Sequence, residues 1–325
     1  MRAIFLLFES LGFTLLLSIL LSQSSFSLLA KLVGGRGYLL GPFAWLCSGF
    51  VILLFAWLLN RIRRGRGLKE LGFHLHKGFL ADVWYRVLGY GLIYILSLPI
   101  DLVALSPRAK MAGELIAQLG LSSSLTRVLL LGGLVVLGMG FFTGAFPEEI
   151  RFRGYYQGVG SMELSPLAGF VIAFIPFSFG HYFSHPEWHI SQVVATIIPG
   201  IGLSLLYNAT GSLVVVMTTH TLLNWISFYP PLVYAVTKNK ALSLSLIFVF
   251  ALFFIFLIAI RWQKEVRELF SATSKMFSQK PVISTLLGLG IGGALLSLGS
   301  LSIPHLYSAL LGASLLGISF IKRRR

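Results

Sequence analysis

The chain has 325 residues, of which 56% are hydrophobic and only 11% are charged, whereas a soluble domain carries about 25% charged residues. This composition argues against a soluble protein. The formal net charge of +15 is concentrated in short stretches between apolar runs, which argues against nucleic acid as a partner. Several of these runs reach the roughly 20 residues that a membrane-spanning helix needs.

About ten apolar segments follow one another along the chain. In chain order they cover approximately residues 3–30, 38–59, 79–105, 125–147, 167–183, 190–207, 213–229, 242–260, 282–301 and 306–321. Because the backbone must satisfy its own hydrogen bonds in lipid, such runs form helices. We therefore predict an all-α fold, a polytopic transmembrane helical bundle with about eight core spans and a C-terminal transmembrane hairpin.

The predicted spans group into four parts. Residues 1–124 form N-terminal transmembrane helices, and residues 125–230 form a core that carries the polar motifs described below. Residues 231–262 form the eighth span, and residues 263–325 a charged linker and the hairpin. The first apolar run also resembles a signal peptide, but its length and Glu9 favour a first span.

Basic residues predict the orientation of the chain in the membrane. They cluster at 61–77, at 261–280 and at 322–325. Because such clusters mark cytoplasmic loops, we predict that both termini are cytoplasmic and that the protein lies in the cell (inner) membrane. Membrane lipid is then a partner, through its headgroups. The single cysteine, Cys47, lies in an apolar run and is expected to pack there.

Two adjacent acidic residues, Glu148 and Glu149, follow the fourth apolar run, and Arg153 comes four residues after the second. On a helix this spacing allows Glu149 and Arg153 to pair, while Glu148 points to a different side. Ionisable groups at membrane depth suggest a functional site. The alternative is a charged helix end at the membrane interface.

Two further motifs place polar side chains in apolar segments. His181 follows Phe177 on one helix face, and Asn224 follows His220 at the same spacing. Each motif alone has an ordinary explanation, a packed histidine or a hydrogen bond between helices. Together with the glutamates they could activate water, stabilise an oxyanion or hold zinc.

In this order and spacing, the motifs Glu-Glu-x-x-x-Arg, Phe-x-x-x-His and His-x-x-x-Asn resemble the CPBP intramembrane proteases. This family includes the CAAX endopeptidases and bacterial abortive-infection and bacteriocin-processing proteins. A further match is the stretch 207–213, where Gly211 suits a tight turn and Ser212 suits a helix N-cap. The resemblance covers about residues 125–230.

The resemblance implies an intramembrane endopeptidase and a role for each motif residue. Glu148, assisted by His181, would activate water, and His220 with Asn224 would stabilise the oxyanion. The supporting residues would be Glu149, Arg153 and Phe177. The substrate would be a membrane-associated protein or peptide, a prenylated tail being one candidate.

The sequence leaves the cofactor and the function class open. An older interpretation of the family places a metal on the same Glu and His residues, so zinc is one alternative, although no His-Glu-x-x-His motif is present. A histidine stripe at 181, 185 and 189 is a second metal candidate, but Pro186 disfavours a continuous helix there. A non-catalytic scaffold or immunity-type protein on the same fold is the main alternative to an enzyme, and a transporter is another.

Overall fold

The regular structure of the described residues is entirely helical. In the computed structural model these residues are 2–20, 37–74, 79–118, 126, 130, 132–184, 190–261, 266–278, 282–300 and 314–316. They contain no β-strand, which confirms the predicted all-α class. The segments are α1 (Arg2–Leu20), α3 (Gly37–Arg64), η1 (Lys69–Leu71), α4 (Phe79–Gln118), α6 (Gly133–Met139), η3 (Gly140–Ala145), α7 (Phe146–Glu149), η4 (Ile150–Gln157), α8 (Gly158–Glu163), α9 (Pro166–Ser184), α10 (Ile190–Thr210), α11 (Leu213–Thr237), α12 (Lys240–Arg261), α13 (Arg267–Ser278) and α14 (Val282–Ser300).

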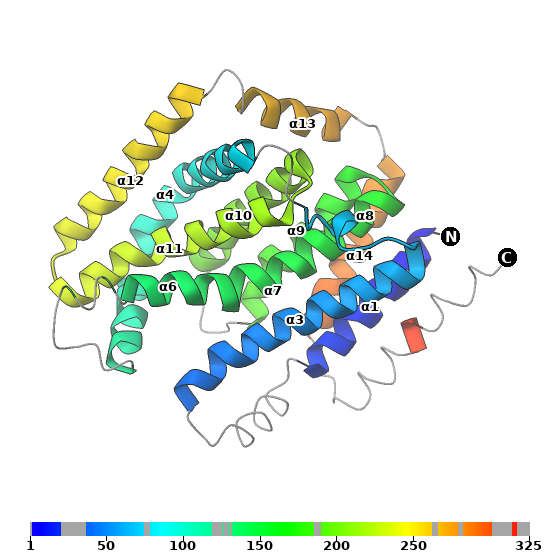
Figure 1. Cartoon of the computed structure of the whole chain (residues 1–325), viewed down its shortest axis with the longest axis horizontal. Coiled ribbons are helices and arrows are strands. Elements are labelled where there is room, and N and C mark those ends of the chain that lie inside the picture. The colour runs from blue at the N-terminus through cyan, green and yellow to red at the C-terminus, as the bar shows by residue number, and fades with distance from the viewer. Residues whose placement is uncertain are drawn as a thin grey trace.

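Among the described residues, three stretches of helix are long and apolar enough to cross a membrane. They cover Arg86–Glu114, Gly133–Glu163 and Lys240–Arg261. The last of these, α12, lies at the edge of the bundle (Figure 1) and exposes Leu252 by 65% and Phe256 by 62%. Large exposed apolar side chains along one helix suit contact with lipid. The chain is therefore a helical membrane protein, and the number of about ten spans stays a prediction.

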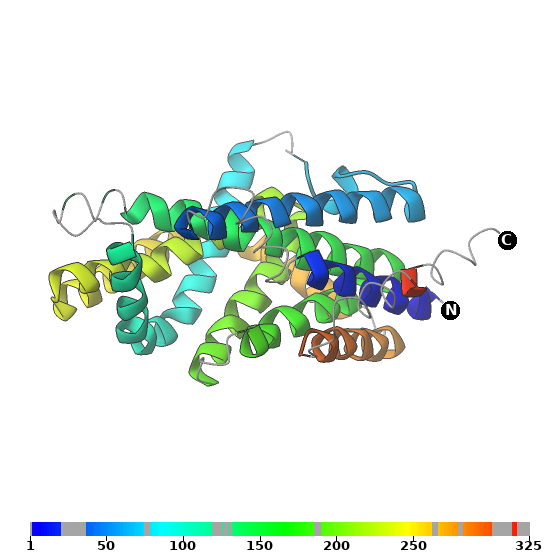
Figure 2. The same cartoon turned by 90° about the horizontal axis from the view of Figure 1, so that it is seen from below.

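Helix α11 runs through the middle of the bundle and packs against α4, α12, α6 and η3. Helix α9 packs against both α10 and α14. Helix α3 lies along one face, beside the helix that runs from α6 to α8 (Figure 2). Segments that are distant in the sequence therefore meet around α7, the short helix that carries the two glutamates.

The helix that carries Glu148 and Glu149 does not end after Pro147, so the predicted boundary of the fourth span is wrong. The helix continues from Gly133 to Glu163. Its polar second half stays helical inside the bundle because its side chains find partners there. Gln157, for example, is fully buried and donates a hydrogen bond from Nε2 to the carbonyl oxygen of Ser204 at 2.7 Å. The glutamates thus lie near the middle of this candidate span.

The turn that precedes α11 has the predicted conformation. Gly211 adopts a positive φ of 64°, which favours glycine. The hydroxyl of Ser212 accepts a hydrogen bond from the backbone N–H of Val215 and caps the helix. Both predictions for this turn are confirmed, and the cap fixes where α11 begins and hence where His220 lies along it.

The N-terminal helices are joined to the Glu148-bearing helix by a buried polar cluster around Glu9. This carboxylate is fully buried and accepts hydrogen bonds from Arg63 at 3.0 Å and Arg64 at 2.8 Å. It also accepts one from the hydroxyl of Tyr155 at 2.6 Å. Because α1, α3 and η4 each supply a member, this Glu9 cluster fixes the three segments relative to one another.

Candidate active site

A buried ion pair lies at the centre of the site. Nη1 of Arg153 donates to Oε1 of Glu149 at 2.9 Å, and both side chains are fully buried. Nη2 of Arg153 donates to the carbonyl oxygen of Gly200 at 3.1 Å. The guanidinium carbon also lies 4.0 Å from the ring centre of Phe177, in a cation–π contact. The pair expected from the four-residue spacing is thus present, and it joins η4 to α9 and α10.

The close approach of α10 at this point depends on Gly200. A Cβ atom on Gly200 would lie 2.3 Å from Oγ of Ser178, a distance that real Cβ atoms do not adopt. The absence of a side chain therefore lets the Gly200 carbonyl reach Arg153.

His220 is held by the same carboxylate. Its Nδ1 lies 2.6 Å from Oε1 of Glu149, and the imidazole is buried. Because an ionised carboxylate only accepts hydrogen bonds, Nδ1 carries the proton. The structure therefore gives Glu149 a second contact that sequence reasoning did not foresee: it orients His220 as well as pairing with Arg153.

Glu148 occupies a different environment from its neighbour. Its side chain is 29% exposed, whereas that of Glu149 is fully buried. Oε2 of Glu148 lies 3.9 Å from Nε2 of His220, which is too long for a direct hydrogen bond. Of the two carboxylates, Glu148 is the one accessible to a ligand.

Two π-helical segments flank the glutamates, η3 before α7 and η4 after it. Turns of this kind are uncommon and occur frequently at functional sites. They rotate the side chains that follow them relative to an ideal α-helix. The directions in which Glu148 and Arg153 point therefore could not be taken from regular helical spacing alone.

His181 lies near the end of α9, beside Phe177. Nδ1 of His181 lies 2.6 Å from the carbonyl oxygen of Phe177, so Nδ1 is again the donor. In the neutral ring Nε2 then keeps its lone pair and can act as a base. The ring of Phe177 packs edge-on against both His181 and His220.

Asn224 lies one turn beyond His220 on α11, where the neighbouring helix approaches closely. A Cβ atom on Gly140 would lie 3.3 Å from Cβ of Asn224, and one on Gly144 would lie 3.1 Å from its Nδ2. These two glycines, four residues apart, thus let η3 pack directly over Asn224. The side chain of Asn224 is consequently confined to a narrow space.

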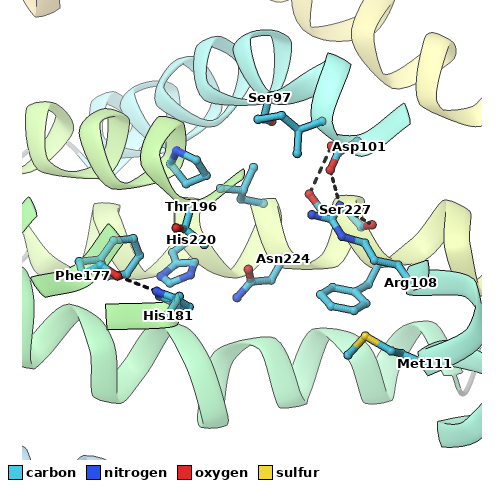
Figure 3. A pocket seen from close by; sticks show the side chains of 14 residues that line it. Ser97, Asp101, Arg108, Met111, Phe177, His181, Thr196, His220, Asn224 and Ser227 are labelled. Carbon is cyan, nitrogen blue, oxygen red and sulfur yellow. Dashed lines mark hydrogen bonds and ion pairs between the residues drawn. The ribbon is translucent and has the colours of Figure 1, made fainter. Parts of the chain in front are cut away.

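One cavity is lined by three of the four predicted catalytic residues. It has a volume of about 150 Å³ and is lined by His181, His220 and Asn224, with Phe177 at one side (Figure 3). Glu148 does not line this cavity, and its carboxylate approaches the site residue His220, whose Nε2 lies 3.9 Å from Oε2 of Glu148. The cavity is also lined by Asp101 and Arg108, which sequence reasoning did not assign to the site. An acidic residue inside an apolar span was the signal that could have pointed to them.

The described residues offer no ready-made metal site. Among them, no three His, Cys, Asp or Glu side chains lie together as a possible ligand set. Glu148, His181 and His220 thus do not form one in this arrangement, and Nδ1 of each histidine is engaged by a carbonyl or carboxylate oxygen. The second metal candidate includes residues 185 and 189, which lie outside the described part of the chain.

Comparison with known proteins agrees with the motifs. Residues 130–226 match the family described as Rce1-like, type II CAAX prenyl endopeptidase Rce1-like. Neither the curated proteins nor the solved structures gave a match. The matched segment contains every motif residue from Glu148 to Asn224, which confirms the predicted resemblance. Residues 130–226 of this chain are thus similar to the CAAX-protease-like CPBP family of intramembrane proteins.

Proposed function

We propose that this protein is an intramembrane endopeptidase that hydrolyses a peptide bond of a membrane-associated protein or peptide. The observation that carries the proposal is the chain of contacts from Arg153 through Glu149 to His220, which ends at a cavity also lined by His181 and Asn224. A buried carboxylate that orients an imidazole is an arrangement that hydrolases use. The family match supports the same reaction class.

In the proposed mechanism Glu148 and His181 take a proton from water. Glu148 is the accessible carboxylate, and His181 has its Nδ1 bound to a carbonyl oxygen, which leaves Nε2 as the base. The hydroxide equivalent adds to the scissile carbonyl carbon. The proton then passes to the leaving amine as the tetrahedral intermediate collapses.

His220 and Asn224 would stabilise the oxyanion of that intermediate. Nδ1 of His220 is already used by Glu149, so Nε2 must carry a second proton to donate. Two carboxylates lie near its ring nitrogens, Glu149 at 2.6 Å from Nδ1 and Glu148 at 3.9 Å from Nε2.

The geometry also supports a second role for His220. With only Nδ1 protonated, Nε2 is an acceptor that could itself take the proton from water, as the histidine of a carboxylate–histidine pair does. The distance of 3.9 Å between this atom and Glu148 would allow a water to bridge them. As an oxyanion donor, His220 carries a proton on both ring nitrogens before the reaction. As a base, it carries one on Nδ1 only.

The experiment that tests the function compares membrane peptides from cells with the wild-type protein and cells with Glu148→Ala. We expect at least one peptide to be cleaved only in the wild-type cells. Glu114→Ala is the matched control, because Glu114 is an exposed glutamate on α4. Identical peptides in wild-type and Glu148→Ala cells, at equal protein levels, would refute the proposal and favour a scaffold on the same fold.

A further inference from the structure

The helix α13 connects α12 to α14 and lies along the outer rim of the bundle (Figure 1). It occupies 12 residues of the segment that the sequence predicts as a charged linker. α13 packs against α10 and α9, and Nδ2 of Asn208 on α10 donates a hydrogen bond to Sδ of Met276 at 2.6 Å. Met276 is buried. One face of α13 is therefore docked on the helix that supplies the Gly200 carbonyl to Arg153.

The length of α12 fixes the depth of α13 in the membrane. α12 has 22 residues, which corresponds to about 33 Å at a rise of 1.5 Å per residue, and the hydrocarbon core of a bilayer is about 30 Å thick. α12 is thus long enough to cross the hydrocarbon once, and a basic residue stands at each end, Lys240 and Arg261. α13 follows within a few residues and runs crosswise to α12 (Figure 1). This places α13 at the boundary between the hydrocarbon and the headgroups.

Two phenylalanines of α13 extend outward beside the docked face. Phe270 is 57% exposed and Phe277 is 55% exposed. Because they are seven residues apart, they lie on the same side of the helix. The ring of Phe277 also contacts that of Phe170 on α9, with 6.4 Å between the ring centres. Exposure of two large rings to water is unfavourable, whereas the rings of a helix at a bilayer boundary enter the acyl region.

The side of α13 that follows the two rings is polar and basic. Arg267 and Lys275 are exposed there, together with three exposed serines. Within the described part of the chain, neither basic side chain takes part in an ion pair. Residues 261–280 contain five basic and two acidic residues, which gives a net charge of +3. A helix with exposed rings on one side and basic residues on the next fits an anionic membrane surface.

We propose that α13 is an interfacial helix that binds anionic phospholipids of the adjacent leaflet. Arg267 and Lys275 bind the phosphate of the headgroup, and Phe270 and Phe277 enter the acyl region beneath it. A lipid suits this surface better than a protein partner because α12, which precedes it, exposes large apolar side chains along the hydrocarbon. The inference assigns to one helix the lipid contact that the sequence predicts only for basic clusters in general. It goes beyond the proposed function and is independent of peptidase activity.

The test measures lipid binding at α13 itself. A small fluorophore is attached to the full chain through Ser278→Cys at the end of α13, and Cys47→Ala removes the single native cysteine. The labelled chain is reconstituted in phosphatidylcholine nanodiscs with increasing amounts of a lipid whose brominated acyl chains quench the fluorophore. The brominated lipid is phosphatidylglycerol in one series and phosphatidylcholine in the other. We expect phosphatidylglycerol to bind about 25-fold more tightly, about fivefold for each of the two basic residues.

Two double variants assign this preference. Arg267→Gln combined with Lys275→Gln should reduce the ratio of the two affinities to about one. Lys238→Gln combined with Lys240→Gln removes the same charge from exposed lysines at the far end of α12 and should leave the ratio unchanged. Because all four residues are exposed, both double variants should fold. A preference that survives in the α13 variant, or an equal loss in the control, would overturn the inference.

Three other results would also overturn the inference. Equal quenching by the two brominated lipids would show contact with hydrocarbon but no selection of the headgroup. The absence of quenching by either lipid would place α13 away from lipid and favour a protein partner. Inorganic phosphate that abolishes the preference, where sodium chloride of the same ionic strength does not, would show that the site takes soluble phosphate. The inference requires quenching that is stronger with phosphatidylglycerol, insensitive to inorganic phosphate beyond the salt effect, and dependent on Arg267 and Lys275.

Discussion

Replacing Arg153 with alanine tests how much the fold depends on the buried ion pair. The change leaves the Glu149 carboxylate fully buried without its guanidinium partner. Breaking such a pair costs roughly 3–5 kcal/mol. The same change removes the hydrogen bond to Gly200 and the contact with Phe177, so the upper part of this range is expected. A loss of this size is a large fraction of the 5–15 kcal/mol that typically stabilises a folded domain.

The assay compares the free energy of unfolding of purified variants in detergent, together with the amount of folded protein in the membrane. Arg151→Ala is the matched control, because Arg151 lies on the same helix without a carboxylate partner among the described residues: it lies over the rings of Phe152 and Tyr156 and donates from Nε to the hydroxyl of Tyr156 at 3.4 Å. Arg151→Ala should lower the free energy of unfolding by about 1 kcal/mol or less. The loss of unfolding free energy in Arg153→Lys should fall between those of the two alanine variants, because lysine keeps the positive charge but lacks the planar guanidinium group. If Arg153→Ala is as stable as Arg151→Ala, the reasoning about the buried pair is refuted.

Three further predictions concern chemistry and topology. Asn224→Ala should lower kcat by about 10²–10³-fold with little change in stability, and a loss below about tenfold would remove Asn224 from the oxyanion site. Elemental analysis of active enzyme should find no stoichiometric zinc, and chelators should leave turnover unchanged; activity lost on chelation and restored by zinc would contradict the proposed mechanism. Reporter fusions after Lys77 and at Arg325 should both report a cytoplasmic location, and an external signal from either would overturn the predicted topology.

The class of fold and the motif residues could be predicted because each depends on local patterns. Apolar runs of sufficient length predict membrane helices, and a glycine before a serine predicts the turn before α11. The pairing of Glu149 with Arg153 is the one expected from their four-residue spacing, although Arg153 itself lies in the π-helical segment η4. The motifs between residues 148 and 224 indicate the family resemblance, and the family match covers the segment that contains them.

Other features could not be predicted because they depend on contacts between helices. The hydrogen bond between His220 and Glu149 joins residues 71 positions apart, and nothing in the spacing of either motif indicates it. The continuation of the helix beyond Pro147 depends on partners such as Ser204, which satisfy polar side chains inside the bundle. The predicted third apolar segment, residues 79–105, ends before Arg108, whereas α4 continues to Gln118 and holds the partner of Arg108, Asp101, two turns earlier in the same helix.

The contacts of Glu9 give the N-terminal helices a role in positioning the site. Tyr155, which binds Glu9, lies two residues after Arg153, so α1 and α3 help to hold the helix that carries the ion pair. Glu9→Gln removes the negative charge that two buried arginines share and should cost about 3 kcal/mol of stability. Because Glu114 is exposed, Glu114→Gln should leave the free energy of unfolding in the same detergent almost unchanged. If the two variants unfold at the same denaturant concentration, the helices outside the matched segment do not depend on Glu9 for their attachment, and the position of Arg153 must be set by α9 and α10 alone.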